Sequence, residues 1–151
     1  MNPGQRKKLR AKSDRLLDAQ TALAWHYTDE ATAATDALLE QFNEGKAALV
    51  STIFHYEVAN CLVGNERRKV PRSSPAKSAA FLGALAQLPI ETDEESTART
   101  ATQTAELART HGLSVYDASY LELAMRKNVP LATRDPQLVR AAKKVGVRLL
   151  L

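Results

Sequence analysis

The chain has 151 residues, enough for one domain with a hydrophobic core of its own. Its 44% hydrophobic and 25% charged residues are ordinary for a globular protein, and no apolar run approaches the ~20 residues of a membrane helix. The single cysteine, Cys61, excludes an internal disulfide and a cysteine-built zinc site. These properties favour a cytoplasmic protein with no membrane partner.

The net charge of +4 is unevenly distributed along the chain. Residues 1–15 contain six basic residues and one acidic residue, a charge of +5, so the rest of the chain carries −1. We therefore expect a flexible basic arm over residues 1–13 and one folded domain over residues 14–151. Because this domain is close to neutral, any binding of nucleic acid must depend on local contacts.

The first half of the chain alternates short apolar runs with amphipathic stretches. A short strand is predicted over residues 15–17, followed by one or two helical turns over residues 21–25. A capping hydroxyl at Thr28, with two acids after it, predicts a helix that ends at Gly45. A buried strand is expected over residues 47–51 and a long helix over residues 53–68.

The second half continues the alternation. Pro75, behind a serine cap, predicts a helix that stops before Pro89. A short edge strand at residues 90–91 and helices at 93–109 and 115–127 follow, with Asn128 as a left-handed cap. A strand at 131–133, a helix at 136–144 and a final strand at 147–151 complete the pattern. Strands alternating with such helices predict a three-layer α/β/α sandwich around a mainly parallel sheet of about five strands.

Four acids fall where such a sheet binds ligands, beyond the carboxyl ends of its strands. Asp18 and Asp135 follow predicted strands, Asp117 begins a helix, and Glu57 lies on a largely apolar helix. A carboxylate in apolar surroundings is costly unless it is paired or bound to a cation. Several acids together are typical of an oxygen-ligand site for Mg²⁺ or Mn²⁺, which can activate water for attack on a phosphodiester.

Each acid also has an ordinary structural interpretation. The three aspartates can be helix caps, and Glu57, which caps nothing, can form a salt bridge. A receiver domain or an Asp-nucleophile phosphatase would need a second acid close to Asp18, where Ala19-Gln20-Thr21 stands instead. The histidines lack metal-ligand spacing and are interpreted as surface or packing residues: His26, His55 and His111.

Four sequence blocks follow one another along residues 15–151. They are Leu17-Asp18-Ala19 with Thr21-Ala22-Leu23-Ala24-Trp25, then Tyr56-Glu57-Val58-Ala59-Asn60-Cys61-Leu62, then Leu113-Ser114-Val115-Tyr116-Asp117-Ala118, and finally Pro130-Leu131-Ala132-Thr133-Arg134-Asp135. Each block alone is weak evidence of a relationship to any family. Together, in this order and near these separations, they resemble PIN-domain ribonucleases, and in particular the VapC-type toxins of toxin–antitoxin pairs.

The resemblance implies a metal-dependent endoribonuclease in which Asp18, Glu57, Asp117 and Asp135 hold Mg²⁺ or Mn²⁺. It also implies an RNA substrate, a homodimer, and a cognate antitoxin that inserts a segment at the active site. Thr133 matches a hydroxyl position that accompanies the last Asp in the family. Gln20 departs from the usual Ser or Asn, so the alternative is a catalytically weak PIN-like module that binds RNA or protein.

Three further features surround these blocks. Asn60 comes one helical turn after Glu57 and is expected to support it. Trp25 is expected to pack in the core or at a dimer interface. The only basic cluster of the body is either a solvated helix end or a contact for RNA or the antitoxin, and it consists of Arg67, Arg68, Lys69 and Arg72.

Overall fold

The computed structural model describes residues 12–151, in which a four-stranded parallel sheet lies at the centre. The strands pair in the order β3-β2-β1-β4. They are β1 (Leu16–Leu17), β2 (Ala48–Val50), β3 (Ile90–Thr92) and β4 (Leu131–Ala132). The inner strands β1 and β2 are buried throughout, as expected for a parallel sheet covered on both faces.

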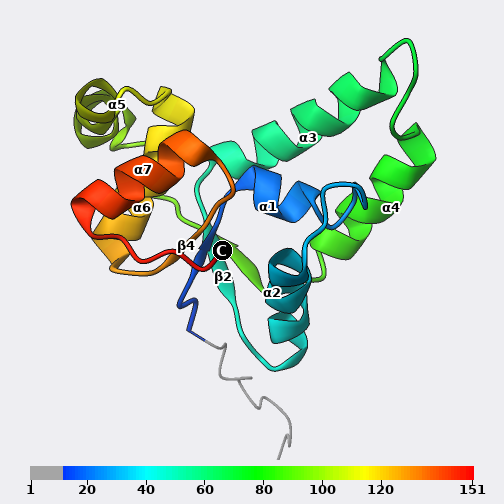
Figure 1. Ribbon diagram of the computed structural model, residues 1–151, viewed down its shortest axis with the longest axis horizontal. Coiled ribbons are helices and arrows are strands. Elements are labelled where there is room, and N and C mark those ends of the chain that lie inside the picture. Colours follow the sequence, from blue (N-terminus) through cyan, green and yellow to red (C-terminus); the bar gives the residue numbers. More distant parts are fainter. Residues whose placement is uncertain (1–11) are drawn as a thin grey trace, which may run out of the picture.

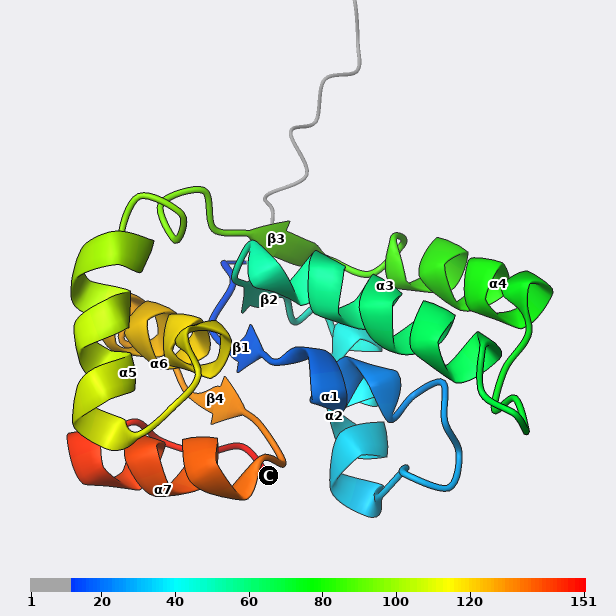
Figure 2. The same ribbon diagram turned by 90° about the horizontal axis from the view of Figure 1, so that it is seen from above.

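Helices cover both faces of this sheet (Figure 1 and Figure 2). One layer contains α1 (Ala19–Leu23), α2 (Ala33–Asn43), α3 (Ile53–Glu66) and α4 (Pro75–Leu85). The other contains α5 (Ala105–His111), α6 (Val115–Lys127) and α7 (Pro136–Val145). The predicted α/β/α sandwich is therefore confirmed. Within the described part of the chain, no helix is both long and apolar enough to cross a membrane.

The start of α2 differs from the prediction, because residues 28–30 form a turn and the helix begins after Thr32. The hydroxyl of Thr32 accepts the N–H of Thr35, and the hydroxyl of Thr35 accepts the N–H of Thr32. This reciprocal cap satisfies two free N–H groups and fixes the helix start. The acids at 29 and 30 are instead bound by Arg72, at 2.8 and 2.9 Å.

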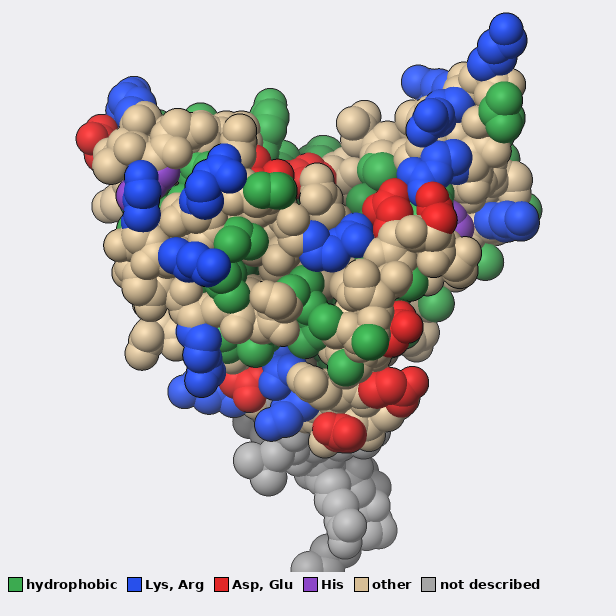
Figure 3. Space-filling model, in the orientation of Figure 1, with side chains coloured by type: hydrophobic (Ala, Val, Ile, Leu, Met, Phe, Trp, Pro, Cys, Tyr) green, Lys and Arg blue, Asp and Glu red, His purple; other side chains and the backbone are tan. Residues whose placement is uncertain are grey.

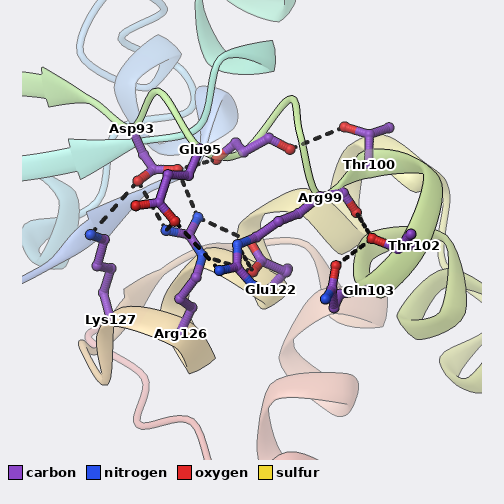
Figure 4. A network of polar contacts seen from close by, with 10 residues as sticks. Asp93, Glu95, Arg99, Thr100, Thr102, Gln103, Glu122, Arg126 and Lys127 are labelled. Carbon is purple, nitrogen blue, oxygen red and sulfur yellow. Dashed lines mark hydrogen bonds and ion pairs between the residues drawn. The ribbon is translucent and has the colours of Figure 1, made fainter.

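The helix predicted over residues 93–109 is also wrong in its first half. Turns at residues 94–99 lead into a π-helical segment, η1 (Thr100–Thr104), and α5 begins only at Ala105. Asp93 directly follows β3 and begins no helix: it is buried and accepts from Arg126 of α6 at 2.7 Å (Figure 4). Arg126 also donates to Glu122 at 2.8 Å, and Arg99 approaches Glu122 at 3.7 Å.

The final predicted strand is reduced to one parallel bridge between Leu131 and Leu149, so the sheet has four strands rather than about five. Trp25 packs on the core as predicted. Its indole N–H donates to the carbonyl of Thr35 at 2.8 Å, and its ring stands edge-on to Phe42. Residues 1–11, most of the predicted basic arm, lie outside the described residues.

Candidate metal centre

The carboxyl ends of β1 and β4 lie side by side because these strands pair in parallel, with Leu17 opposite Ala132. Asp18 follows β1 directly and caps α1, while Asp135 follows β4 and caps α7. The parallel pairing therefore brings both carboxylates to one edge of the sheet. This edge is the upper end of the sheet in Figure 1, where β1 leads into α1 near the centre of the picture.

Asp18 is the most buried of the four predicted acids, with 4% of its surface exposed. Its Oδ1 accepts the backbone N–H of Thr21 at 2.8 Å and the Thr21 hydroxyl at 2.7 Å. Burial raises the pKa of Asp18, and the charge of Asp117 adds to this, although the hydroxyls of Thr133 and Thr21 lower it. Asp18 is thus both a helix cap and a carboxylate whose hydrogen bonds only partly offset the cost of burying its charge.

Glu57 comes from the second turn of α3. Burial, followed by the charges of Asp117 and Asp18, raises the pKa of Glu57 to about 7. Its Oε1 is buried and has no hydrogen-bond partner among residues 12–151. A salt bridge, the ordinary explanation for this residue, is likewise not formed within the described part of the chain.

Asp117 and Asp135 complete the set. The Ser114 hydroxyl caps α6 by accepting the N–H of Asp117 at 3.0 Å, and Asp135 Oδ1 accepts the N–H of Leu138 at 2.8 Å. Burial raises the pKa of Asp117, as does the charge of Asp135, while the Ser114 hydroxyl lowers it. Capping uses one oxygen of Asp135, so it does not exclude a second role for this side chain.

We call Asp18, Glu57, Asp117 and Asp135 the acid cluster. Repulsion connects Glu57 with both Asp18 and Asp117, and Asp117 with Asp135. A divalent cation would remove this repulsion, and carboxylate oxygens suit Mg²⁺ or Mn²⁺. Across residues 12–151, no three acid, histidine or cysteine side chains are gathered closely enough to hold a metal as they stand. A cation would therefore have to draw the carboxylates of the acid cluster closer together.

The three predicted supporting residues have different surroundings. Thr133 is buried, its hydroxyl accepts the N–H of Asp135 at 3.1 Å, and it lowers the pKa of Asp18, so it contacts both aspartates. The side chain of Gln20 is exposed on the first turn of α1. Asn60 is exposed beside Tyr56 in a shallow hollow on α3, one turn after Glu57.

Sequence reasoning did not identify several residues that the structure places at this site. Thr21 and Ser114 each stand three residues from an acid, which is the spacing of helix caps, so the capping pattern was a usable signal. Tyr120 is three residues after Asp117 and therefore on the same side of α6. Burial raises the pKa of Tyr120, and so do the acids nearby, Glu57 first.

The histidines lie elsewhere. His26 is within 2.9 Å of the Ser73 hydroxyl and stacks on Phe81, and His55 is within 2.7 Å of the Thr92 hydroxyl. His111 is half-buried in the last turn of α5.

The basic cluster lies where α3 and α4 meet, in what we call the α3–α4 hairpin (residues 53–85). Arg72 is tied to the acids at 29 and 30, and its guanidinium lies 4.4 Å from the centre of the Tyr27 ring. The three other basic residues are exposed: Arg67, Arg68 and Lys69. Figure 3 shows basic side chains along this hairpin and acidic ones in the saddle between it and the opposite lobe.

Solved structures share this fold. A protein of Pyrobaculum aerophilum superposes with a TM-score of 0.63 at 22% identity, over 99% of this chain and 93% of that one. VapBC2 from Rickettsia felis, bound to a DNA fragment from its promoter, superposes with a TM-score of 0.60 at 15% identity, over 89% of this chain and 96% of that one. A toxin–antitoxin complex from Klebsiella pneumoniae superposes with a TM-score of 0.59 at 18% identity, over 91% of this chain and 98% of that one.

No curated protein sequence matches the chain. The family model of the PIN domain matches residues 15–144, the stretch that contains the four sequence blocks and the whole acid cluster. The family resemblance inferred from those blocks is confirmed. This chain belongs to the PIN domain family.

Proposed function

We propose that this PIN domain is a metal-dependent endoribonuclease and acts in the cytoplasm as the toxin of a toxin–antitoxin pair. The acid cluster carries the proposal, above all Oε1 of Glu57, which is buried and has no hydrogen-bond partner in residues 12–151. Uncompensated carboxylates at one edge of a sheet destabilise a domain that only serves as a scaffold. A site that binds a divalent cation explains why they are there.

In this proposal the acid cluster holds Mg²⁺ or Mn²⁺. The bound cation supplies an activated water and stabilises charge on the phosphodiester under attack. Asp18 and Asp135 are fixed by their own capping bonds, and the Thr133 hydroxyl spans both, so these carboxylates are preorganised. Asp117 sits in the first turn of α6, where the positive end of the helix dipole helps to keep it ionised.

The partners in this proposal are an RNA substrate, a cognate antitoxin and a second copy of the chain. Two of the compared structures contain toxin–antitoxin pairs. The α3–α4 hairpin exposes apolar side chains that a protein partner would cover, and Tyr56, 75% exposed, is the largest of them. The exposed basic residues 67–69 at the end of α3 offer contacts for RNA phosphates.

The direct test is cleavage of a structured RNA by the purified full chain. We expect cleavage with Mn²⁺ or Mg²⁺, its loss in EDTA, and its recovery when excess metal is returned. In cells, expression without the antitoxin should arrest growth, and co-expression of the small protein encoded next to it should relieve the arrest. A protein that binds RNA but leaves it intact at every metal concentration would contradict the nuclease assignment.

The alternative is a PIN-like module that binds RNA or protein without cutting. Gln20 is the observation that favours it, because this longer amide projects from the first turn of α1, two residues after Asp18. Binding of RNA that is equal in EDTA and in Mn²⁺, with no cleavage in either, would support this alternative. Restoring cleavage by Gln20→Ser would show that the amide itself blocks the site.

A further inference from the structure

Two buried polar atoms near the acid cluster have no hydrogen-bond partner among the described residues: the hydroxyl of Tyr120 and Oε1 of Glu57. The first is a donor and the second an acceptor. Tyr120 is only 1% exposed, so its hydroxyl does not reach bulk water. Buried polar groups are almost always satisfied by protein or by an ordered water, so each of these two atoms indicates a missing contact.

The position of Tyr120 brings its hydroxyl to the acids. The residue lies on α6 one turn after Asp117, and its hydroxyl is close to the backbone N–H of Ala19, directly after Asp18. Glu57 is the charged group that raises the pKa of Tyr120 most strongly, ahead of Asp18 and Asp117. The phenol therefore lies close to the acid cluster.

The hydroxyl of Tyr120 can also act as a hydrogen-bond donor. The ring of Tyr120 is buried in the core, so its direction is fixed and only the hydroxyl proton rotates. The N–H of Ala19 is a donor, so it can use only the lone pairs of the phenol oxygen. The proton remains available for a carboxylate, and Glu57 Oε1 is the buried oxygen of the acid cluster that has no partner.

We propose that Tyr120 is a positioning residue of the metal centre: its hydroxyl donates a hydrogen bond to one buried water, which in turn donates to Glu57 Oε1. This bridge holds the Glu57 carboxylate in one orientation and leaves its other oxygen for the cation. The inference rests on the proposed function, since it concerns a Glu57 that binds Mg²⁺ or Mn²⁺.

The test variant is Tyr120→Phe, which removes the hydroxyl and keeps the ring that fills the core. Tyr27→Phe is a matched control because the Tyr27 hydroxyl is also buried and without a partner in residues 12–151. Its charged neighbours are Arg72 and Glu30 rather than the acid cluster. The two variants therefore delete the same atom from similar surroundings, once beside the acids and once away from them.

The readout is Mn²⁺ binding to the RNA-free full chain by titration calorimetry, with melting curves in EDTA. Tyr120→Phe should bind Mn²⁺ about 10- to 100-fold more weakly, as for loss of a group that orients a metal ligand. Its metal-free melting temperature should fall by no more than about 2–6 °C, because only one hydrogen bond is lost and the ring stays in place. Tyr27→Phe should bind Mn²⁺ as the parent does. Adding Tyr120→Phe to Glu57→Gln should weaken binding no further, because the hydroxyl acts through Glu57.

Parent-like Mn²⁺ affinity in Tyr120→Phe would overturn the positioning role and leave the nuclease proposal intact. Equal weakening in Tyr27→Phe would also overturn it, since the effect would then belong to any lost core hydroxyl. If the parent itself neither binds Mn²⁺ nor cleaves RNA, the proposed function fails first and the inference about Tyr120 fails with it.

Discussion

Arg134 binds Glu30 twice, through the side-chain carboxylate at 3.1 Å and through the backbone carbonyl at 2.6 Å. Because Arg134 stands between Thr133 and Asp135, these bonds hold the loop after β4 against the loop before α2. Glu30 also accepts from Arg72 at 2.9 Å, which ties the α3–α4 hairpin to the same point. An ionic chain thus connects one side of the acid cluster to the hairpin.

Arg134→Met keeps an unbranched apolar stem and removes these bonds. We expect the free energy of unfolding to fall by about 1–3 kcal/mol, the range for hydrogen bonds to charged groups. Urea unfolding with an unchanged m-value measures this. Arg109→Met is the control, because the Arg109–Glu106 pair is fully on the surface and its loss should cost less than ~0.5 kcal/mol. Equal losses in the two variants would contradict a structural role for the chain.

Glu57 should make the stability of the metal-free protein depend on pH. Its pKa is raised from 4.5 to about 7, so folding favours the protonated carboxyl. This contribution is fully present below pH 4.5 and is lost as the pH rises to about 7. Glu57→Gln removes this titration. The melting temperature of the variant in EDTA, minus that of the parent, should therefore increase as the pH rises from 4.5 to about 7. Glu106→Gln, on the exposed side of α5, should follow the parent, and a constant difference for Glu57→Gln would count against the assignment.

The elements that sequence predicted well are those fixed by local chemistry. Inner strands such as Leu16–Leu17 are continuous apolar runs, and the predicted caps at Ser74 and Asn128 mark helix ends. Asp18 and Asp135 follow strands, so parallel pairing alone places them at one edge.

The elements that sequence did not predict depend on distant contacts. Asp93 looks like a helix start, but its burial depends on Arg126, 33 residues away. Tyr120 looks like an ordinary core residue in the sequence. Only the assembled structure shows that its hydroxyl, like Glu57 Oε1, is buried without a hydrogen-bond partner among residues 12–151.

The ion network of Figure 4 should be essential for stability. Arg126→Met would leave Asp93 and Glu122, both nearly fully buried, without their strongest partner. Breaking a buried ion pair on one side costs about 3–5 kcal/mol, and Lys127 and Arg99 are too distant for full compensation. Urea unfolding of Arg126→Met and of the surface control Arg109→Met compares the two cases directly. A loss below ~1 kcal/mol in Arg126→Met would mean that the network adds little net stability.

The last prediction concerns Asp117, where charge and scaffold can be separated. Asp117→Asn keeps the size of the side chain and its place in the first turn of α6 but removes the charge that a cation requires. The charge of Asp117 raises the pKa of Glu57, and Asp135 raises that of Asp117, so the folded metal-free protein gains from its removal. The variant should therefore be folded, with a melting temperature in EDTA equal to or above the parent's.

Its RNA cleavage should fall at least ~10²-fold, the scale for losing one electrostatic element of an active site. The melting temperature should also rise less on addition of Mn²⁺, because weaker binding stabilises less. Asp36→Asn is the matched control, an exposed aspartate in the first turn of α2, and it should cleave as the parent does. Cleavage measured against Mn²⁺ concentration for all three proteins decides the matter. Equal cleavage by Asp117→Asn and the parent would remove Asp117 from the metal centre, whereas a loss shared by Asp36→Asn would point to a general effect of charge at helix starts.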